Sequence, residues 1–179
     1  MDYLKGKVVV VLVIDELSGL LPKIRSLVDE GYSVFEVTLR TPCALAALKE
    51  IRAAFPDLKL GAGTVLTEEQ LRLAIEAGAD FGVAPGYNAS ITSKAKELNF
   101  DFIPGVSTAS EIEVAMAAGY SLLKLFPAEA VGGIKLIKAL SGPYTDVTFM
   151  PTGGVSEANY QAYLDLESVC CVGGSWMTK

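Results

Sequence analysis

The sequence contains no histidine, and this absence excludes more classes of function than any residue that is present. Hydrolases that move protons through a Ser-His-Asp or Cys-His arrangement are excluded, and so are metal centres built on imidazole ligands. General acid–base chemistry in this chain therefore has to be carried by a carboxylate, a lysine, a tyrosine or backbone dipoles.

The sequence also has few cysteines, no long apolar run and no excess of positive charge. The three cysteines (Cys43, Cys170 and Cys171) show no Cys-x-x-Cys spacing, so neither a disulfide framework nor a zinc site is expected. No apolar run approaches the roughly 20 residues that span a bilayer, and the first residues lack the layout of a signal peptide. The net charge of −6 argues against nucleic acid as a partner. We expect a cytoplasmic protein with neither a membrane nor a nucleic-acid partner.

Short β-rich runs alternate with helical patterns over the whole chain, which at 179 residues is long enough for one domain. Strands are predicted at 8–14, 33–39, 58–61, 80–84, 100–103, 122–126, 147–150 and 168–172, and helices at 17–30, 43–55, 68–77, 89–98, 109–118, 133–140 and 157–164. Eight such β/α units predict a single (β/α)₈ TIM barrel over residues 1–179. A doubly wound open sheet would need a glycine-rich first turn, and residues 14–17 contain no glycine.

Lys124 is the one charged residue in an apolar run from Leu122 to Phe126. A strand of this kind is typically buried on both faces, and desolvation there favours the neutral, nucleophilic amine that forms Schiff bases with carbonyl compounds. The alternative is an ordinary lysine at a strand end whose amine reaches water.

Side-chain alternation places two more charges beside Lys124. Along the second predicted strand, Glu36 and Arg40 fall on the face opposite the apolar residues Phe35 and Val37. In a barrel the apolar face packs against the helices, so Glu36, Arg40 and Lys124 should converge inside, near the C-terminal mouth where such barrels build active sites. A purely structural ion pair between Glu36 and Lys124 is the alternative.

Two glycine clusters follow the last two predicted strands, at 151–154 and 173–175. Glycine lets backbone N–H groups approach an anion closely, and the loops after strands seven and eight commonly hold a phosphate in this fold. The sequences at 61–64 and 84–86 could be plain turns, although Thr64 would place a hydroxyl beside Arg40.

Six ordered motifs resemble one enzyme family. They are Glu36-Val37-Thr38-Leu39-Arg40-Thr41, Gly61-Ala62-Gly63-Thr64-Val65, Pro104-Gly105-Val106-Ser107-Thr108, Lys124-Leu125-Phe126-Pro127-Ala128-Glu129, Pro151-Thr152-Gly153-Gly154-Val155 and Gly173-Gly174-Ser175-Trp176. Together they are similar to the 2-keto-3-deoxy-6-phosphogluconate (KDPG) aldolases, the class that also cleaves 4-hydroxy-2-oxoglutarate.

The resemblance implies a metal-independent class I aldolase without a cofactor, typically a homotrimer. In it Lys124 forms a Schiff base with the C2 ketone, Glu36 is the general base and acid, and the products are pyruvate and glyceraldehyde 3-phosphate. It further implies that Arg40 and Thr64 hold the carboxylate and that Pro85 and Phe126 shape the pocket. The implied phosphate ligands are Thr152, Gly153, Gly154, Gly174 and Ser175.

The chain departs from the family pattern at both ends, where it leaves little room for an N-terminal helix and none for a closing helix. We expect uncovered apolar surface on the barrel floor and on the first and last strands, so that the chain is a fragment or associates with another copy. The sequence leaves open an aldolase for the C4 epimer (2-keto-3-deoxy-6-phosphogalactonate), a non-catalytic phosphometabolite-binding barrel, and an epimerase or lyase that uses acid–base chemistry alone.

Overall fold

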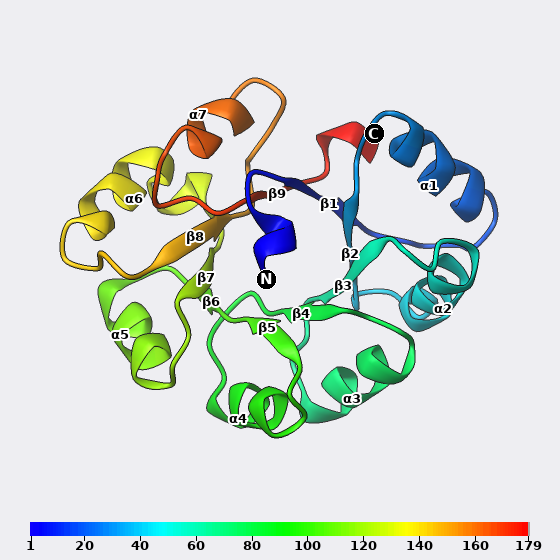
Figure 1. Cartoon of the computed structure of the whole chain (residues 1–179), viewed down its shortest axis with the longest axis horizontal. Helices are drawn as coiled ribbons and strands as arrows, with labels where there is room; N and C mark the ends of the chain where they lie inside the picture. The colour runs from blue at the N-terminus through cyan, green and yellow to red at the C-terminus, as the bar shows by residue number, and fades with distance from the viewer. Residues whose placement is uncertain (179) are drawn as a thin grey trace.

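The strands run parallel and alternate with helices in the computed structural model, which describes residues 1–178. Figure 1 shows the strands gathered around the centre of the molecule with the α-helices outside them. The strands are β1 (Val8–Leu12), β2 (Val34–Thr38), β3 (Lys59–Gly63), β4 (Phe81–Val83), β5 (Asp101–Ile103), β6 (Gly105–Val106), β7 (Leu122–Leu125), β8 (Thr148–Pro151) and β9 (Val172–Gly174). The α-helices are α1 (Leu20–Asp29), α2 (Ala44–Ala54), α3 (Glu68–Glu76), α4 (Ala89–Glu97), α5 (Ala109–Ala117), α6 (Gly133–Ser141) and α7 (Tyr160–Leu164), and the 3₁₀ helices are η1 (Asp2–Leu4), η2 (Glu129–Val131) and η3 (Trp176–Thr178).

The parallel sheet is curled, and its hydrogen-bonded ladders fall into two parts. One part has the order β5-β4-β3-β2-β1-β9, and the other has the order β6-β7-β8. The chain passes from β5 to β6 through Pro104, whose missing N–H interrupts the ladder. On the other side, isolated parallel bridges join Phe149 to Val169 and Thr152 to Gly173. The predicted α/β architecture with parallel strands is therefore confirmed.

The two faces of the strands pack against different cores, as the alternation of side chains predicted. Phe35 and Val37 of β2 are fully buried in the cluster that also contains the apolar residues of α1 and α2. Val34, one position earlier, faces inward in a second cluster with Phe81 and Met150. Residues of even number on β2 therefore point to the inside of the curled sheet, where Glu36 lies.

Short capping residues begin several helices. The Thr67 hydroxyl accepts a hydrogen bond from the N–H of Gln70 at the start of α3, and Asn88 does the same for α4. Thr108 and Glu111 form the capping box expected at the start of α5. The helices thus begin close to the positions predicted, except for α1 and α7, which begin at Leu20 and Tyr160 instead of residues 17 and 157.

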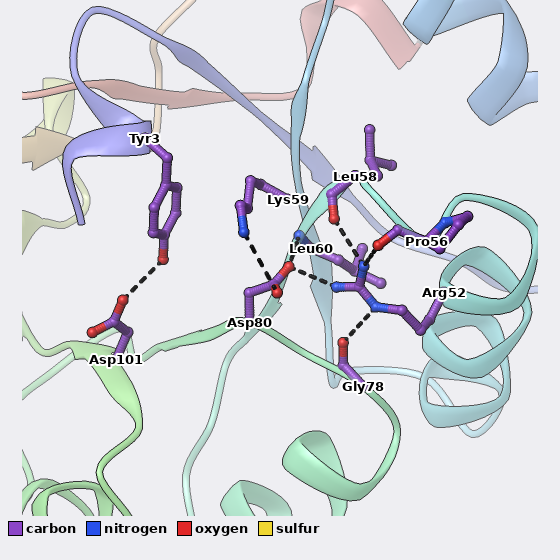
Figure 2. A network of polar contacts seen from close by, with 9 residues as sticks. All are labelled: Tyr3, Arg52, Pro56, Leu58, Lys59, Leu60, Gly78, Asp80 and Asp101. Atoms are coloured by element: carbon purple, nitrogen blue, oxygen red, sulfur yellow. Dashed lines mark hydrogen bonds and ion pairs between the residues drawn. The ribbon is translucent and has the colours of Figure 1, made fainter.

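The floor of the sheet, at the N-terminal ends of the strands, is covered by η1. Leu4 is fully buried among the inward-facing residues, and the Tyr3 hydroxyl donates to Oδ2 of Asp101 over 3.2 Å (Figure 2). The Lys59 ammonium lies 5.2 Å from the centre of the Tyr3 ring. Three residues of 3₁₀ helix thus place one leucine under the core and cover part of the floor.

Arg52 ties α2 to the same end of the sheet. Its guanidinium donates to the carbonyl oxygens of Gly78 (2.9 Å), Pro56 (2.7 Å) and Leu58 (3.0 Å) and to Oδ2 of Asp80 (2.6 Å), as Figure 2 shows. These contacts use the fixed fork of donors that only arginine provides. They join the end of α2 to the segments that lead into β3 and β4.

The described residues after β9 form η3 rather than an α-helix. The Trp176 ring stacks on Tyr160 with 5.4 Å between ring centres, and in Figure 1 this segment lies between α7 and α1. We expected apolar surface to be exposed on the first and last strands. Val10 of β1 and Val172 of β9 are instead fully buried. None of the helices in residues 1–178 combines the length and apolar character needed to cross a bilayer.

Candidate active site

A cavity of about 170 Å³ opens at the C-terminal ends of the strands, the end at which enzymes of this architecture carry out their chemistry. It is lined by every site residue that the sequence indicated: Glu36, Arg40, Thr64, Pro85, Lys124, Phe126, Thr152, Gly153, Gly154, Gly174 and Ser175. A larger hollow of about 370 Å³ lies at the opposite end beside η1, but neither Lys124 nor Glu36 lines it. The structure thus brings the predicted residues together, while their individual roles stay a prediction.

Lys124 and Glu36 form a buried pair at the bottom of this cavity. The distance from Lys124 Nζ to Glu36 Oε1 is 3.5 Å, and the two residues are 5% and 0% exposed. The Lys124 ammonium also lies 5.4 Å from the centre of the Phe126 ring. Within residues 1–178, the second carboxylate oxygen of Glu36 has no hydrogen-bond partner. Buried polar atoms are normally paired, so this oxygen keeps the capacity to accept a proton or a hydrogen bond.

Glycines in β3 provide the space for the Glu36 side chain. A Cβ atom on Gly63 would overlap the Glu36 carboxylate, and one on Gly61 would overlap the Phe81 ring. The sequence had indicated that the strand ends at Gly61, with a turn after it. That boundary is wrong, because β3 pairs with β2 as far as Gly63, opposite Thr38. These glycines leave room for inward-facing side chains of the neighbouring strands.

The mouth of the cavity holds two polar residues and one buried threonine. Arg40 is exposed just beyond β2, and Thr64 adopts a positive φ of 58° just beyond β3. A β-branched residue rarely takes this conformation, and such strain gathers at functional sites. Thr38, which sequence reasoning did not select, also lines the cavity and donates its hydroxyl to Leu12 O over 3.0 Å. Its shared face with Glu36 and Arg40 was the signal that could have identified it.

Residues 152–155, here called the glycine loop, form another part of the cavity wall. Gly153 and Gly154 have φ values of 95° and 82°, which favour glycine. Thr152 is buried, and within residues 1–178 its hydroxyl oxygen has no hydrogen-bond partner. Thr152 bridges to Gly173, where a Cβ atom would overlap the threonine side chain. The glycine loop therefore lines the cavity with Thr152, whose buried hydroxyl is unpaired among the described residues, and with a backbone conformation that favours glycine.

The second glycine cluster lies in a strand and not after one. Gly173 and Gly174 belong to β9 and pair with Val9 and Val10 of β1, so the predicted strand at 168–172 was placed too early. Ser175 follows directly at the mouth of the cavity. Within residues 1–178, no three acidic, cysteine or histidine side chains lie close enough together to hold a metal ion.

Comparison with known proteins agrees with this geometry. The family model described as "Aldolase: KDPG and KHG aldolase" matches residues 2–179. The chain belongs to this family. KHG denotes the 4-hydroxy-2-oxoglutarate substrate, and the family consists of carbon–carbon lyases.

Several members of the KDPG and KHG aldolase family are close to this chain in sequence and structure. The KHG/KDPG aldolase of Escherichia coli (strain K12) is 46% identical over 96% of this chain and 81% of its own length. The 2-dehydro-3-deoxy-phosphogluconate aldolase of Dickeya dadantii is 45% identical over the same shares. The crystal structure of KDPG aldolase from Legionella pneumophila, with pyruvate captured as a covalent carbinolamine, has a TM-score of 0.94 and 43% identity, covering 98% of this chain and 85% of that one.

Proposed function

We propose that this chain cleaves KDPG to pyruvate and glyceraldehyde 3-phosphate through a Schiff base on Lys124. The observation that carries the proposal is the buried Lys124–Glu36 pair, 3.5 Å apart at the bottom of a cavity. Buried ion pairs contribute little to stability, so a functional reason for keeping one is favoured. Membership of the KDPG and KHG aldolase family supports the same reaction.

In this cycle Glu36 first takes a proton from the Lys124 ammonium, and the neutral amine then attacks the C2 ketone. A proton passes from the nitrogen to the ketone oxygen, and a carbinolamine forms. Glu36, whose Oε2 is unpaired, supplies the proton with which the C2 hydroxyl leaves as water, and a protonated imine remains. The resulting carboxylate of Glu36 removes the proton of the C4 hydroxyl. The C3–C4 bond then breaks, and its electron pair moves through C3 to the imine nitrogen.

This cleavage releases glyceraldehyde 3-phosphate and leaves an enamine on Lys124. A proton returns to C3, and water hydrolyses the imine to release pyruvate and regenerate the amine. Glu36 can serve both proton transfers, since it is buried beside Lys124 and lines the cavity. The same pair therefore carries every proton step of the cycle.

Different residues around the Lys124–Glu36 pair bind different groups of the substrate. At the mouth, Arg40 and Thr64 hold the carboxylate, for which a guanidinium offers two parallel donors. Pro85 and Phe126 bound the pocket on its apolar side. The phosphate falls to Thr152, Gly153, Gly154, Gly174 and Ser175, which line another part of the cavity wall. The positive φ of both loop glycines and the unpaired Thr152 hydroxyl support this assignment.

We also propose activity on 4-hydroxy-2-oxoglutarate, which would give pyruvate and glyoxylate by the same steps. The names of the relatives carry both substrates, and the chemistry at Lys124 does not require a phosphate. The C4 epimer of KDPG differs at the carbon whose hydroxyl faces Glu36, and a direct comparison of cleavage rates distinguishes the two epimers.

The finer architecture is likewise a proposal. Residues 1–179 would form one (β/α)₈ domain in which β5 and β6 are a single strand interrupted by Pro104. The isolated bridges from Phe149 to Val169 and from Thr152 to Gly173 support closure. We further propose that the protein is cytoplasmic and forms a homo-oligomer, a trimer by family resemblance. The association is supported by the exposure of two apolar side chains, Val13 (46%) and Leu66 (52%). A folded monomer in sedimentation would contradict this assembly.

Reduction with borohydride tests the proposed function directly. Incubation with pyruvate and sodium borohydride should add one reduced pyruvyl group to the intact mass of the wild-type chain and none to Lys124→Ala. An adduct in both proteins, or in neither while both remain folded, would contradict the Schiff-base mechanism. The second result would favour the non-catalytic phosphometabolite-binding barrel or an enzyme that uses acid–base chemistry alone.

A further inference from the structure

Glu129 lies directly behind the glycine loop, although it does not line the cavity. The segment that follows β7 runs along this loop, with the Ala128 N–H donating to Thr152 O (2.8 Å) and the Glu129 N–H to Gly153 O (3.0 Å). The stem of Glu129 packs against Gly154 so closely that a Cβ atom there would come within 2.6 Å of Glu129 Cγ. The backbone of Glu129 and the stem of its side chain thus support the loop from outside.

Tyr163 of α7 holds the carboxylate of Glu129 in place. Tyr163 is fully buried, and its hydroxyl donates a hydrogen bond to Glu129 Oε1. Burial, together with the hydrogen bond and charge of Glu129, raises the pKa of Tyr163, so the hydroxyl keeps the proton that it donates. The contact leaves no space nearby, since a Cβ atom on Gly133 would lie 2.7 Å from the tyrosine oxygen and 2.9 Å from the carboxylate.

Asn159 restrains the same loop from its other end. Its amide donates to Gly154 O over 3.3 Å, and its Oδ1 accepts the Ser156 N–H over 2.8 Å. Two glycines in succession have wide conformational freedom, so a loop built on Gly153 and Gly154 needs such external contacts to keep one shape. The Glu129 carboxylate is also a negative charge next to a proposed anion site, and a hydrogen bond that fixes its direction limits repulsion.

We propose that Tyr163 and Glu129 are positioning residues that fix the glycine loop for the phosphate group of the substrate. The inference rests on the proposed function, because the phosphate-binding role of the loop belongs to it. Among the described residues, no hydrogen bond or ion pair joins Tyr163 or Glu129 to the Lys124–Glu36 pair. The contact between Tyr163 and Glu129, here called the clamp, therefore acts on recognition of the phosphate and leaves the chemical steps alone. A merely structural contact would lower stability and would affect phosphorylated and unphosphorylated substrates alike.

Steady-state kinetics of Tyr163→Phe with two substrates test the clamp. The variant keeps the ring and removes one hydroxyl, and losing a single ordering hydrogen bond should raise the KM for KDPG about three- to tenfold. The kcat for KDPG and the KM for 4-hydroxy-2-oxoglutarate should stay within about twofold of wild type. Glu129→Gln retains an acceptor oxygen for Tyr163 and should keep the KM for KDPG close to that of wild type, whereas Glu129→Ala should raise it.

Tyr144→Phe is the matched control, because the Tyr144 hydroxyl donates to Glu113 over 2.9 Å at an exposed position away from the cavity. It should leave all the constants unchanged. Equal increases in KM for both substrates in Tyr163→Phe, or no increase for KDPG, would overturn the clamp. Glu129→Ala provides the same readout if Tyr163→Phe fails to fold, since Glu129 is exposed.

Binding of inorganic phosphate, measured by titration calorimetry, separates this inference from the proposed function. The dissociation constant for phosphate should rise about three- to tenfold in Tyr163→Phe and stay unchanged in Tyr144→Phe. If the wild-type chain traps no pyruvate with borohydride, the proposed function fails, while the phosphate titration still decides the clamp. If wild type and Tyr163→Phe bind phosphate equally, or if wild type binds none, the clamp is wrong even when pyruvate is trapped.

Discussion

The Lys124 ammonium lies 3.5 Å from Glu36 Oε1, although 88 positions separate the two residues in the chain. The contact joins β7 to β2 across the inside of the curled sheet, and each residue is at most 5% exposed. Placing two opposite charges in such a position costs desolvation that their attraction barely offsets. Their proximity is therefore better explained by proton transfer than by stability.

Replacing Glu36 by Gln tests this explanation. The amide fills the same space beside Gly63 but cannot take up a proton, so kcat for KDPG cleavage should fall roughly 10²- to 10⁴-fold. Borohydride trapping of pyruvate should remain detectable at a lower rate, because Lys124 is still present. A kcat within about tenfold of wild type would show that Glu36 is not the main proton carrier.

Adding one methyl group at Gly63 should damage the site through contact alone. The Cβ atom of Gly63→Ala overlaps the Glu36 carboxylate, so the chain should lose about 1–3 kcal/mol of stability and at least about tenfold in kcat. Gly142→Ala is the matched control, because its nearest contact is an ordinary 3.7 Å to Ala139 O. Urea unfolding and cleavage rates measure both effects, and unchanged activity in Gly63→Ala would be inconsistent with the packing described.

Arg52 at the floor should matter for stability and not for catalysis. Arg52→Met leaves three carbonyl oxygens and Asp80 without their guanidinium donor, which should cost about 2 kcal/mol and lower Tm by about 4–8 °C. The kcat of the folded enzyme should not change. Arg72→Met provides the comparison, since its pairs with Glu69 and Glu76 are exposed and should leave Tm nearly unaltered. Equal shifts in both variants would contradict the special role of Arg52.

Alkaline pH should weaken the contact of Tyr120 with α4. Burial, with a smaller contribution from Tyr87, raises the pKa of Tyr120 from 10.0 to about 12, and its hydroxyl donates to Thr92 O over 2.8 Å. Since the pKa is higher in the folded chain, the stabilising contribution is complete below about pH 10 and is lost as the pH rises toward 12.

Urea unfolding at pH 9 and pH 11.5 measures this loss. The free energy of unfolding of Tyr120→Phe should be lower than that of wild type at pH 9, and the difference should shrink at pH 11.5. The comparison cancels the other buried tyrosines, because they titrate in both proteins. A difference that stays constant between the two pH values would mean that Tyr120 does not titrate differently in the folded and unfolded chains.

The order of elements and the meeting of Glu36, Arg40 and Lys124 could be predicted from the sequence, because both follow from local periodicity and from the common edge of parallel strands. The ends of β3 and β9 could not. Gly63 and Gly174 carry no side chain to mark a strand, and only pairing with β2 and β1 makes them part of one.

Contacts of side chains outside the strand pattern were also beyond prediction. The bond between Tyr163 and Glu129 depends on where α7 packs, and no periodic pattern records it. The three residues of η1 are too few to show a helical period, so the burial of Leu4 had no signal in the sequence. Local patterns therefore predicted the framework, whereas packing decided the supports of the site.

The position of η1 determines how the protein can be attached to a surface. Leu4 is fully buried and Tyr3 is bonded to Asp101 at the floor, while Met1 is 37% exposed there. A linker joined to Met1 would leave from the end of the molecule opposite the cavity. Immobilised through this terminus, every copy would turn its substrate entrance toward the bulk liquid, so a flow reactor should retain access to the site.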